Sequence, residues 1–147
     1  MDHIDQQMAQ RVWQRVRGEP EKTSLSGLIL AEYQAAADYQ NLQRRIPSKA
    51  ALFRQLYEDV RRHSACLMGI RQLQGAGGKK PVLPKPKEEP LPILLRRCCG
   101  QCMKTAADYQ SRATDPEYGA VFTNLAREKQ RHLRLLLEII GDPTESK

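Results

Sequence analysis

Apolar residues recur every three or four positions in five stretches of the chain, which is the spacing of one buried face of an α-helix. Segments rich in glycine and proline separate these stretches. The longest of them, QGAGGKKPVLPKPKEEPLP, contains five prolines and no helical pattern. The pattern therefore predicts five helices, over about 4–17, 24–45, 48–73, 91–113 and 115–140.

Capping residues stand at the expected starts of three of these helices. Ser24 and Ser48 are predicted N-caps, because a serine hydroxyl can accept a hydrogen bond from a free N–H of the first turn. Asp115 is followed by Pro116, and proline is favoured at the first position of a helix. The last helix is therefore predicted to begin at this pair.

The sequence contains an internal repeat. The five residues AADYQ occur at 36–40 and again, 70 positions later, at 106–110. The segment LFRQLYEDVRRHSACL aligns with VFTNLAREKQRHLRLL at an offset of 69, which matches His63 with His132. The chain is therefore predicted to contain two copies of one helical hairpin.

The repeat and the breaks define the expected organisation. Short connections make the two helices of each hairpin antiparallel neighbours, and a proline-rich crossover of about 17 residues can span the length of a bundle. The fold class is therefore all-α, a four-helix bundle of two repeated hairpins with a long crossover and an additional N-terminal helix. The expected segments are 1–23 for the N-terminal helix and linker, 24–141 for the bundle (hairpins 24–73 and 91–141, crossover 74–90) and 142–147 for a polar tail.

Composition narrows the expected surroundings and partners. The formal charge is +7, but the 24 Lys and Arg residues alternate with acids and form no long basic run, which argues against specific binding of nucleic acid. No apolar run reaches the roughly 20 residues that a membrane span needs, and the N-terminus is too polar for a signal peptide. We expect a cytoplasmic protein with reduced cysteines, whose partner is an unidentified protein or a second copy of the chain.

Polar residues on the predicted inner faces give the chain a family resemblance. From the second to the fifth predicted helix, the layout resembles the rubrerythrin-like branch of the ferritin-like superfamily. In that family the first and third bundle helices carry Glu seven residues before an inward Tyr, and these acids help to form a di-iron carboxylate site. Here Glu32 precedes Tyr39 by seven residues, whereas Cys102 occupies the same place before Tyr109.

The second and fourth bundle helices carry Glu-x-x-His in the same family. This sequence keeps both histidines but has Val60 three residues before His63 and Lys129 three residues before His132. Val60 thus occupies a former ligand position. The resemblance implies a di-iron site that is largely lost, and with it the oxidase or peroxidase activity of the family.

Each of these two motifs also has one acid, directly before Val60 in the first and directly before Lys129 in the second. Asp59 and Glu128 lie four residues before the two histidines. At 100° per residue they fall about 60° from the centre of the inner face, on the side opposite to Val60 and Lys129. The geometry predicts that both acids lie at the rim of the bundle.

The inward lysine suggests how the former site has changed. We expect Lys129 to form a buried ion pair with Glu32, because an inward carboxylate needs a partner. A cation in that place also repels iron. The favoured interpretation is a non-catalytic protein without a cofactor, which functions in binding or assembly.

Three alternatives remain open from the sequence, and one of them is a basic bundle that docks an acidic partner, in the way some ferritin-like proteins bind DNA. Glu32, His63, Cys102 and His132 could hold Fe or Zn, which would make the chain a metal-dependent oxidoreductase. A second possible thiol site, at Cys98 and Cys99 within CCGQC, gives a weaker signal, because one C-x-x-C motif alone is poor evidence for zinc.

Overall fold

All regular elements that the structure describes are helical, as the all-α prediction requires. The computed structural model describes residues 23–86 and 88–142, so the predicted helix over 4–17 and the end of the polar tail lie outside the described residues. The described elements are α2 (Leu25–Arg45), the short 3-10 helix η1 (Pro47–Lys49), α3 (Ala50–Leu73), α4 (Leu91–Gln110) and α5 (Gly119–Ile140).

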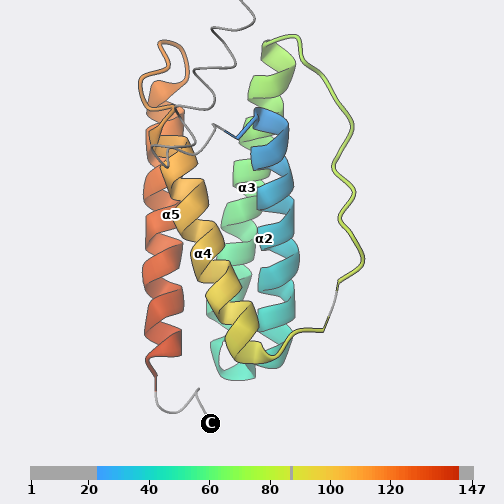
Figure 1. The fold of residues 1–147 in the computed structure, drawn as a ribbon, viewed down its shortest axis with the longest axis vertical. Coiled ribbons are helices and arrows are strands. Elements are labelled where there is room, and N and C mark those ends of the chain that lie inside the picture. Colours follow the sequence, from blue (N-terminus) through green and yellow to red (C-terminus); the bar gives the residue numbers. More distant parts are fainter. Residues whose placement is uncertain (1–22, 87, 143–147) are drawn as a thin grey trace, which may run out of the picture.

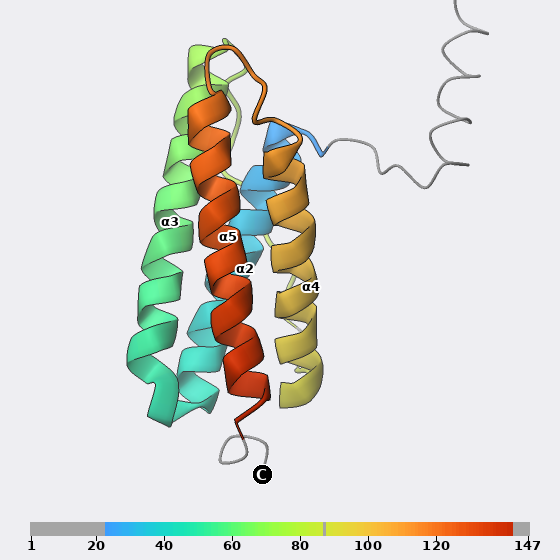
Figure 2. The same cartoon turned by 90° about the vertical axis from the view of Figure 1, so that its left-hand side faces the viewer.

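The four long helices pack in two antiparallel pairs. α2 lies against α3 and α4 lies against α5, and α2 also contacts α4 (Figure 1). The crossover leaves the end of α3 at one end of the bundle and reaches α4 at the other, so the chain between them runs the full length of the helices (Figure 1). Figure 2 shows α3 and α4 on opposite sides, with α5 in front and α2 behind. The crossover therefore joins two diagonally opposed helices.

The first two helix starts differ in their capping. The predicted N-cap of α2 is confirmed, because Ser24 Oγ accepts a hydrogen bond from the N–H of Gly27 at 3.1 Å. The prediction for Ser48 was wrong. α3 begins only at Ala50, after the turn of η1, and Lys49 stands at its N-cap position without a side-chain hydrogen bond. The hairpin turns through η1, which displaces the start of the helix.

The connection between α4 and α5 is longer than predicted. α4 ends at Gln110, and α5 begins at Gly119 rather than at Pro116. Asp115 still caps the turn that leads into α5, because its Oδ1 accepts hydrogen bonds from the backbone N–H groups of Glu117 and Tyr118 and its carbonyl accepts one from Gly119. Gly119 is required for close approach, since a Cβ atom there would lie 2.3 Å from the carbonyl oxygen of residue 113.

A belt of buried polar residues divides the core into two apolar clusters. One cluster gathers around Tyr39, Phe53 and Leu136, and the other around Leu28 and Phe122. On each helix at least one buried polar residue lies between residues of the two clusters along the chain, namely Glu32, His63, Thr105 and Lys129. The belt consequently crosses the middle of the bundle, where all four helices can contribute to it.

An ion pair joins the two hairpins at the outside of α2 and α4. Arg97 of α4 binds the buried Asp38 of α2 through two contacts, Nη1 to Oδ2 at 2.9 Å and Nη2 to Oδ1 at 3.0 Å. The same guanidinium holds Glu89 of the crossover, with Nη2 2.7 Å from Oε1. Bidentate pairs of this kind fix geometry as well as charge. Arg97 therefore secures the end of the crossover to both hairpins.

We expect Arg97→Met to lower the free energy of unfolding by about 1–2 kcal/mol, because it leaves the Asp38 carboxylate buried without its cation. The figure is discounted for the exposure of Arg97, whose side chain is 38% accessible. Urea denaturation followed by circular dichroism measures the change. Arg96→Met is the matched control, since the neighbouring Arg96 is exposed. Equal stability of the two variants would contradict the role assigned to Arg97.

Candidate functional site

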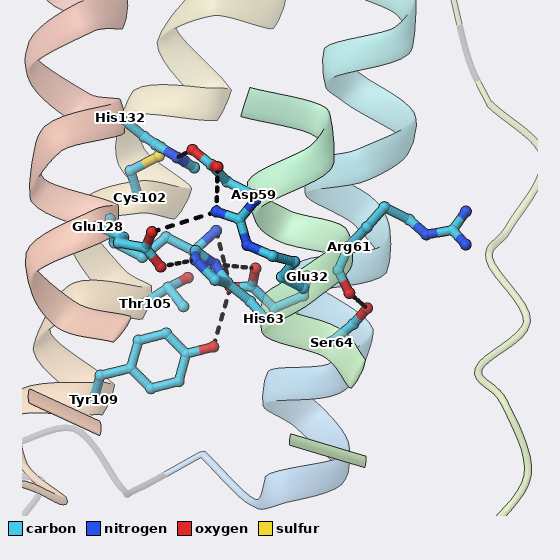
Figure 3. Close-up of polar contacts among 12 residues, drawn as sticks. Glu32, Asp59, Arg61, His63, Ser64, Cys102, Thr105, Tyr109, Glu128 and His132 are labelled. Atoms are coloured by element: carbon cyan, nitrogen blue, oxygen red, sulfur yellow. Dashed lines mark hydrogen bonds and ion pairs between the residues drawn. The ribbon is translucent and has the colours of Figure 1, made fainter. Parts of the chain in front are cut away.

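The polar belt brings together side chains from all four helices. None of its six central residues is more than 4% exposed. They are Glu32 from α2, Asp59 and His63 from α3, Cys102 from α4, and Lys129 and His132 from α5. Figure 3 labels all of them except Lys129 and shows the labelled side chains converging in the interior, with the phenol of Tyr109 approaching from α4. The inner faces predicted from sequence thus meet in one place.

Glu32 is the centre of this cluster. Lys129 Nζ lies 2.8 Å from its Oε1, and the hydroxyl of Tyr109 donates to the same oxygen at 3.1 Å. Its other oxygen, Oε2, lies 3.0 Å from Nδ1 of His63. Burial alone would raise the pKa of Glu32, but the ammonium of Lys129 and the hydrogen bond from His63 hold that pKa below its usual value. Glu32 is therefore a fully enclosed carboxylate whose charge is balanced locally.

His63 connects this carboxylate with a second one nearer the surface. Its Nδ1 faces Glu32, and its Nε2 lies 2.5 Å from Oε2 of Glu128, whose side chain is 34% exposed. Carboxylates only accept hydrogen bonds, whereas an imidazolium donates from both ring nitrogens. His63 therefore bridges two carboxylates and links the interior to the rim.

His132 is held differently, by one carboxylate and one phenol. Its Nε2 lies 3.0 Å from Oδ2 of Asp59, and its Nδ1 lies 3.5 Å from the hydroxyl of Tyr39. Burial and the ammonium of Lys129 lower the pKa of His132 to about 4, although the hydrogen bond to Asp59 acts in the opposite direction. The ring is therefore neutral at pH 7, donates from Nε2 and accepts from Tyr39.

The same tyrosine also contacts the cysteine of the belt. The hydroxyl oxygen of Tyr39 lies 3.5 Å from Sγ of Cys102. Burial raises the pKa of the Cys102 thiol, so the sulfur keeps its proton and can donate it in a hydrogen bond to the phenol. Cys102, Tyr39 and His132 thus form a short chain of neutral hydrogen bonds.

The prediction that Asp59 lies at the rim was wrong. Asp59 is only 4% exposed. Burial would raise the pKa of Asp59, but its hydrogen bonds with His132 and Arg62 lower that pKa overall. Arg62 Nη2 lies 2.6 Å from Oδ1, and Arg131 Nη1 lies 3.3 Å from Oδ2. These partners keep the carboxylate satisfied inside the bundle. Glu128 does lie nearer the rim, as its exposure shows.

The two copies of the repeat exchange their contacts. In each copy an acid precedes the histidine by four residues, and each histidine binds the acid of the other copy. His63 pairs with Glu128, and His132 pairs with Asp59. The spacing acid-x-x-x-His, present in both copies, was the signal in the sequence for these pairs. The two contacts bridge α3 and α5.

The tyrosines follow the same reciprocal rule. Tyr109 of the second copy binds Glu32 of the first, and Tyr39 of the first copy contacts Cys102 of the second. The site therefore has approximate two-fold symmetry in its contacts. The symmetry does not extend to charge. Glu32 of the first copy pairs with Lys129 of the second, whereas the positions equivalent to these two in the repeat are occupied by a thiol and a valine, Cys102 and Val60.

The donor set does not fit a di-iron carboxylate centre. Within residues 23–86 and 88–142, no three His, Cys, Asp or Glu side chains are placed so that they could hold a metal ion. Both oxygens of Glu32 already accept hydrogen bonds, and one of them lies beside an ammonium group. Of the four predicted metal ligands, Glu32 contacts His63 directly, whereas Cys102 and His132 each contact Tyr39.

The possible thiol site at Cys98 and Cys99 belongs to the apolar core. Cys98 and Cys99 are buried in the cluster around Tyr39, and all four cysteines, including the exposed Cys66, are free. Burial raises the pKa of both the Cys98 and the Cys99 thiol. These two residues therefore behave as small apolar side chains and not as reactive thiolates.

Comparisons of this chain with protein-family models, with curated proteins and with solved structures found no match. Among the helices that the structure describes, none combines the length and the apolar character needed to cross a membrane.

The depressed pKa of His132 predicts a loss of stability in mild acid. The imidazole has a pKa of about 4 in the folded protein and an ordinary value of 6.5 when it is released. Between these pH values the unfolded chain binds a proton at His132 that the folded chain does not bind. The contribution of His132 to the free energy of unfolding is therefore present in full above about pH 6.5 and is lost as the pH falls toward 4. The loss from this group is up to about 3 kcal/mol.

Urea denaturation at pH 7, 5.5 and 4.5 tests this expectation. His132→Gln retains a donor for Asp59 but does not titrate, so its free energy of unfolding should depend less steeply on pH over this window. Parallel pH dependences of the wild type and the variant would show that His132 is not the group responsible.

Proposed function

We propose that this chain is a rubrerythrin-like member of the ferritin-like superfamily in which a buried ion-pair network occupies the place of the di-iron site. Its function is then to bind or assemble, with a protein partner or a second copy of itself, and not to catalyse oxidase or peroxidase chemistry. One observation carries the proposal. The ammonium of Lys129 lies 2.8 Å from Glu32, the acid that keeps the family spacing before an inward tyrosine.

Electrostatics connects this observation with the loss of iron. A di-iron site needs several carboxylates because two cations must be neutralised in a region without water. Here one ammonium already balances the central carboxylate at contact distance. An iron ion in the same cavity would meet the repulsion of a buried positive charge, at short range and with little screening.

The asymmetry of the repeat also supports the proposal. Glu32 and Lys129 are present together in one half of the site, and both are replaced by uncharged residues in the other half. A carboxylate left in either half without metal and without a cation would be a buried charge without a partner, which costs several kcal/mol. The single change to Lys129 beside Glu32, and the two changes to Val60 and Cys102 at the equivalent positions, are therefore explained by one requirement, which is neutrality of the interior without metal.

Metal analysis gives the direct test. We expect protein purified without added metal to contain far less than one Fe or Zn per chain, and to take up none after anaerobic loading with Fe²⁺. Inductively coupled plasma mass spectrometry measures both metals. Near-stoichiometric metal that disappears in the double variant His63→Ala/His132→Ala would refute the proposal and favour a metal-dependent redox protein.

Lys129→Glu tests the ion pair itself. The change places two carboxylates together in the interior, so without metal it should lower the free energy of unfolding by about 3 kcal/mol or more. Added Fe²⁺ or Zn²⁺ should restore part of this stability, because a cation then replaces the lysine. Urea denaturation with and without metal measures both effects.

Lys104→Glu is the matched control for this variant, since it makes the same change of charge at an exposed position of α4. It should alter stability by less than about 0.5 kcal/mol. If Lys129→Glu unfolds like Lys104→Glu and binds no metal, Lys129 does not neutralise the former site.

A further inference from the structure

A cavity lies outside the polar belt, between the outer faces of α2 and α3 and the crossover. Its volume is about 630 Å³, which is within the range of sites for small molecules. None of the residues that line it belongs to the buried cluster around Glu32. The cavity therefore needs an explanation of its own.

Small side chains on two helices create this space. Ala36 and Ala37 of α2 face Ala65 of α3, and Met68 adds a flexible apolar surface. Leu83 of the crossover is half-buried and lines the opposite side, whereas its neighbour Val82 is 91% exposed. The crossover thus turns one apolar side chain toward the alanines without filling the volume between them.

Positive charge marks the edge of the cavity. Among the described residues that line it, Arg61 and Lys80 are the only charged ones, and none is an acid. Neither cation has a carboxylate partner among the residues that the structure describes. Figure 3 shows Arg61 extending away from the buried cluster and toward the crossover. The cavity therefore combines an apolar floor with unpaired positive charge.

Tyr57 holds the guanidinium of Arg61 in place. Arg61 Nη1 donates to the hydroxyl of Tyr57 at 3.0 Å, and Cζ lies 5.8 Å from the centre of the same ring. This leaves the N–H groups of the second amino nitrogen for another acceptor. A prepositioned guanidinium loses less freedom when it binds an anion, which favours binding.

We propose that this cavity binds a small amphiphilic anion, with its carboxylate at Arg61 and Lys80 and its apolar body between the alanine floor and Leu83. The cations supply the charge complement, and the apolar lining supplies the larger area of contact. This inference rests on the proposed binding role and names the class of ligand for it. It does not depend on the state of the former metal site.

Titration with decanoate below its micelle concentration tests the inference. Isothermal titration calorimetry should show saturable binding of decanoate and at least about fivefold weaker binding of decanol, which has the same apolar body without the charge. Arg61→Gln should weaken decanoate binding by about tenfold, as expected for loss of a charged hydrogen bond. Ala65→Trp should also abolish binding, because the indole fills the cavity from an exposed position.

Arg54→Gln is the matched control, since Arg54 is an exposed arginine of the same helix that pairs with Glu58 outside the cavity. It should bind decanoate as the wild type does, and circular dichroism should show all three variants folded. The inference is overturned if the wild type shows no saturable binding, if decanol binds equally well, or if Arg54→Gln weakens binding as much as Arg61→Gln. Metal content measured on the same preparation separates failure of this inference from failure of the metal-free interior.

Discussion

A carboxylate without access to water must be neutralised by the groups around it, and Glu32 imposes this requirement on the whole bundle. Its side chain has no exposed surface, and its three partners come from α3, α4 and α5. Each helix must therefore present one particular residue at one particular height. A shift of one turn in any of them would remove one of these partners, and in α5 it would leave the carboxylate without its cation, at a cost far above that of a misplaced apolar contact.

Duplication explains how a small chain meets this requirement. The two hairpins carry the same pattern, and their contacts are exchanged across the approximate two-fold relation, with His63 on Glu128 and His132 on Asp59. Apolar packing alone would permit several registers between two such similar halves. The exchanged polar contacts select one of them, because another register would leave these buried histidines and carboxylates without their partners.

The crossover and the polar belt hold the helices together in different places. The belt joins the helices in the interior, and the pair of Arg97 with Asp38 and Glu89 secures the crossover at the surface. The outer faces of α2 and α3 are consequently free to form a cavity without disturbing the interior. On the proposed function, binding occurs at this surface while the buried network stabilises the fold.

The sequence alone determined the helical class, the two hairpins and the inner faces, because a 3.6-residue period and glycine or proline breaks are local signals. It also placed Glu32 and Lys129 on facing surfaces, since the repeat aligned their helices. Helix ends were less predictable from the sequence, because α5 begins at Gly119, after the turn that Asp115 caps, and η1 displaced the cap expected at Ser48.

Only the tertiary structure decided which partners the buried groups take. Asp59 lies away from the centre of its own helical face, yet it is buried because α5 brings His132 and Arg131 against that side. Helical periodicity measures direction from one axis and contains no information on how close the next helix comes. Burial and pairing depend on that approach, so they are properties of the assembled bundle.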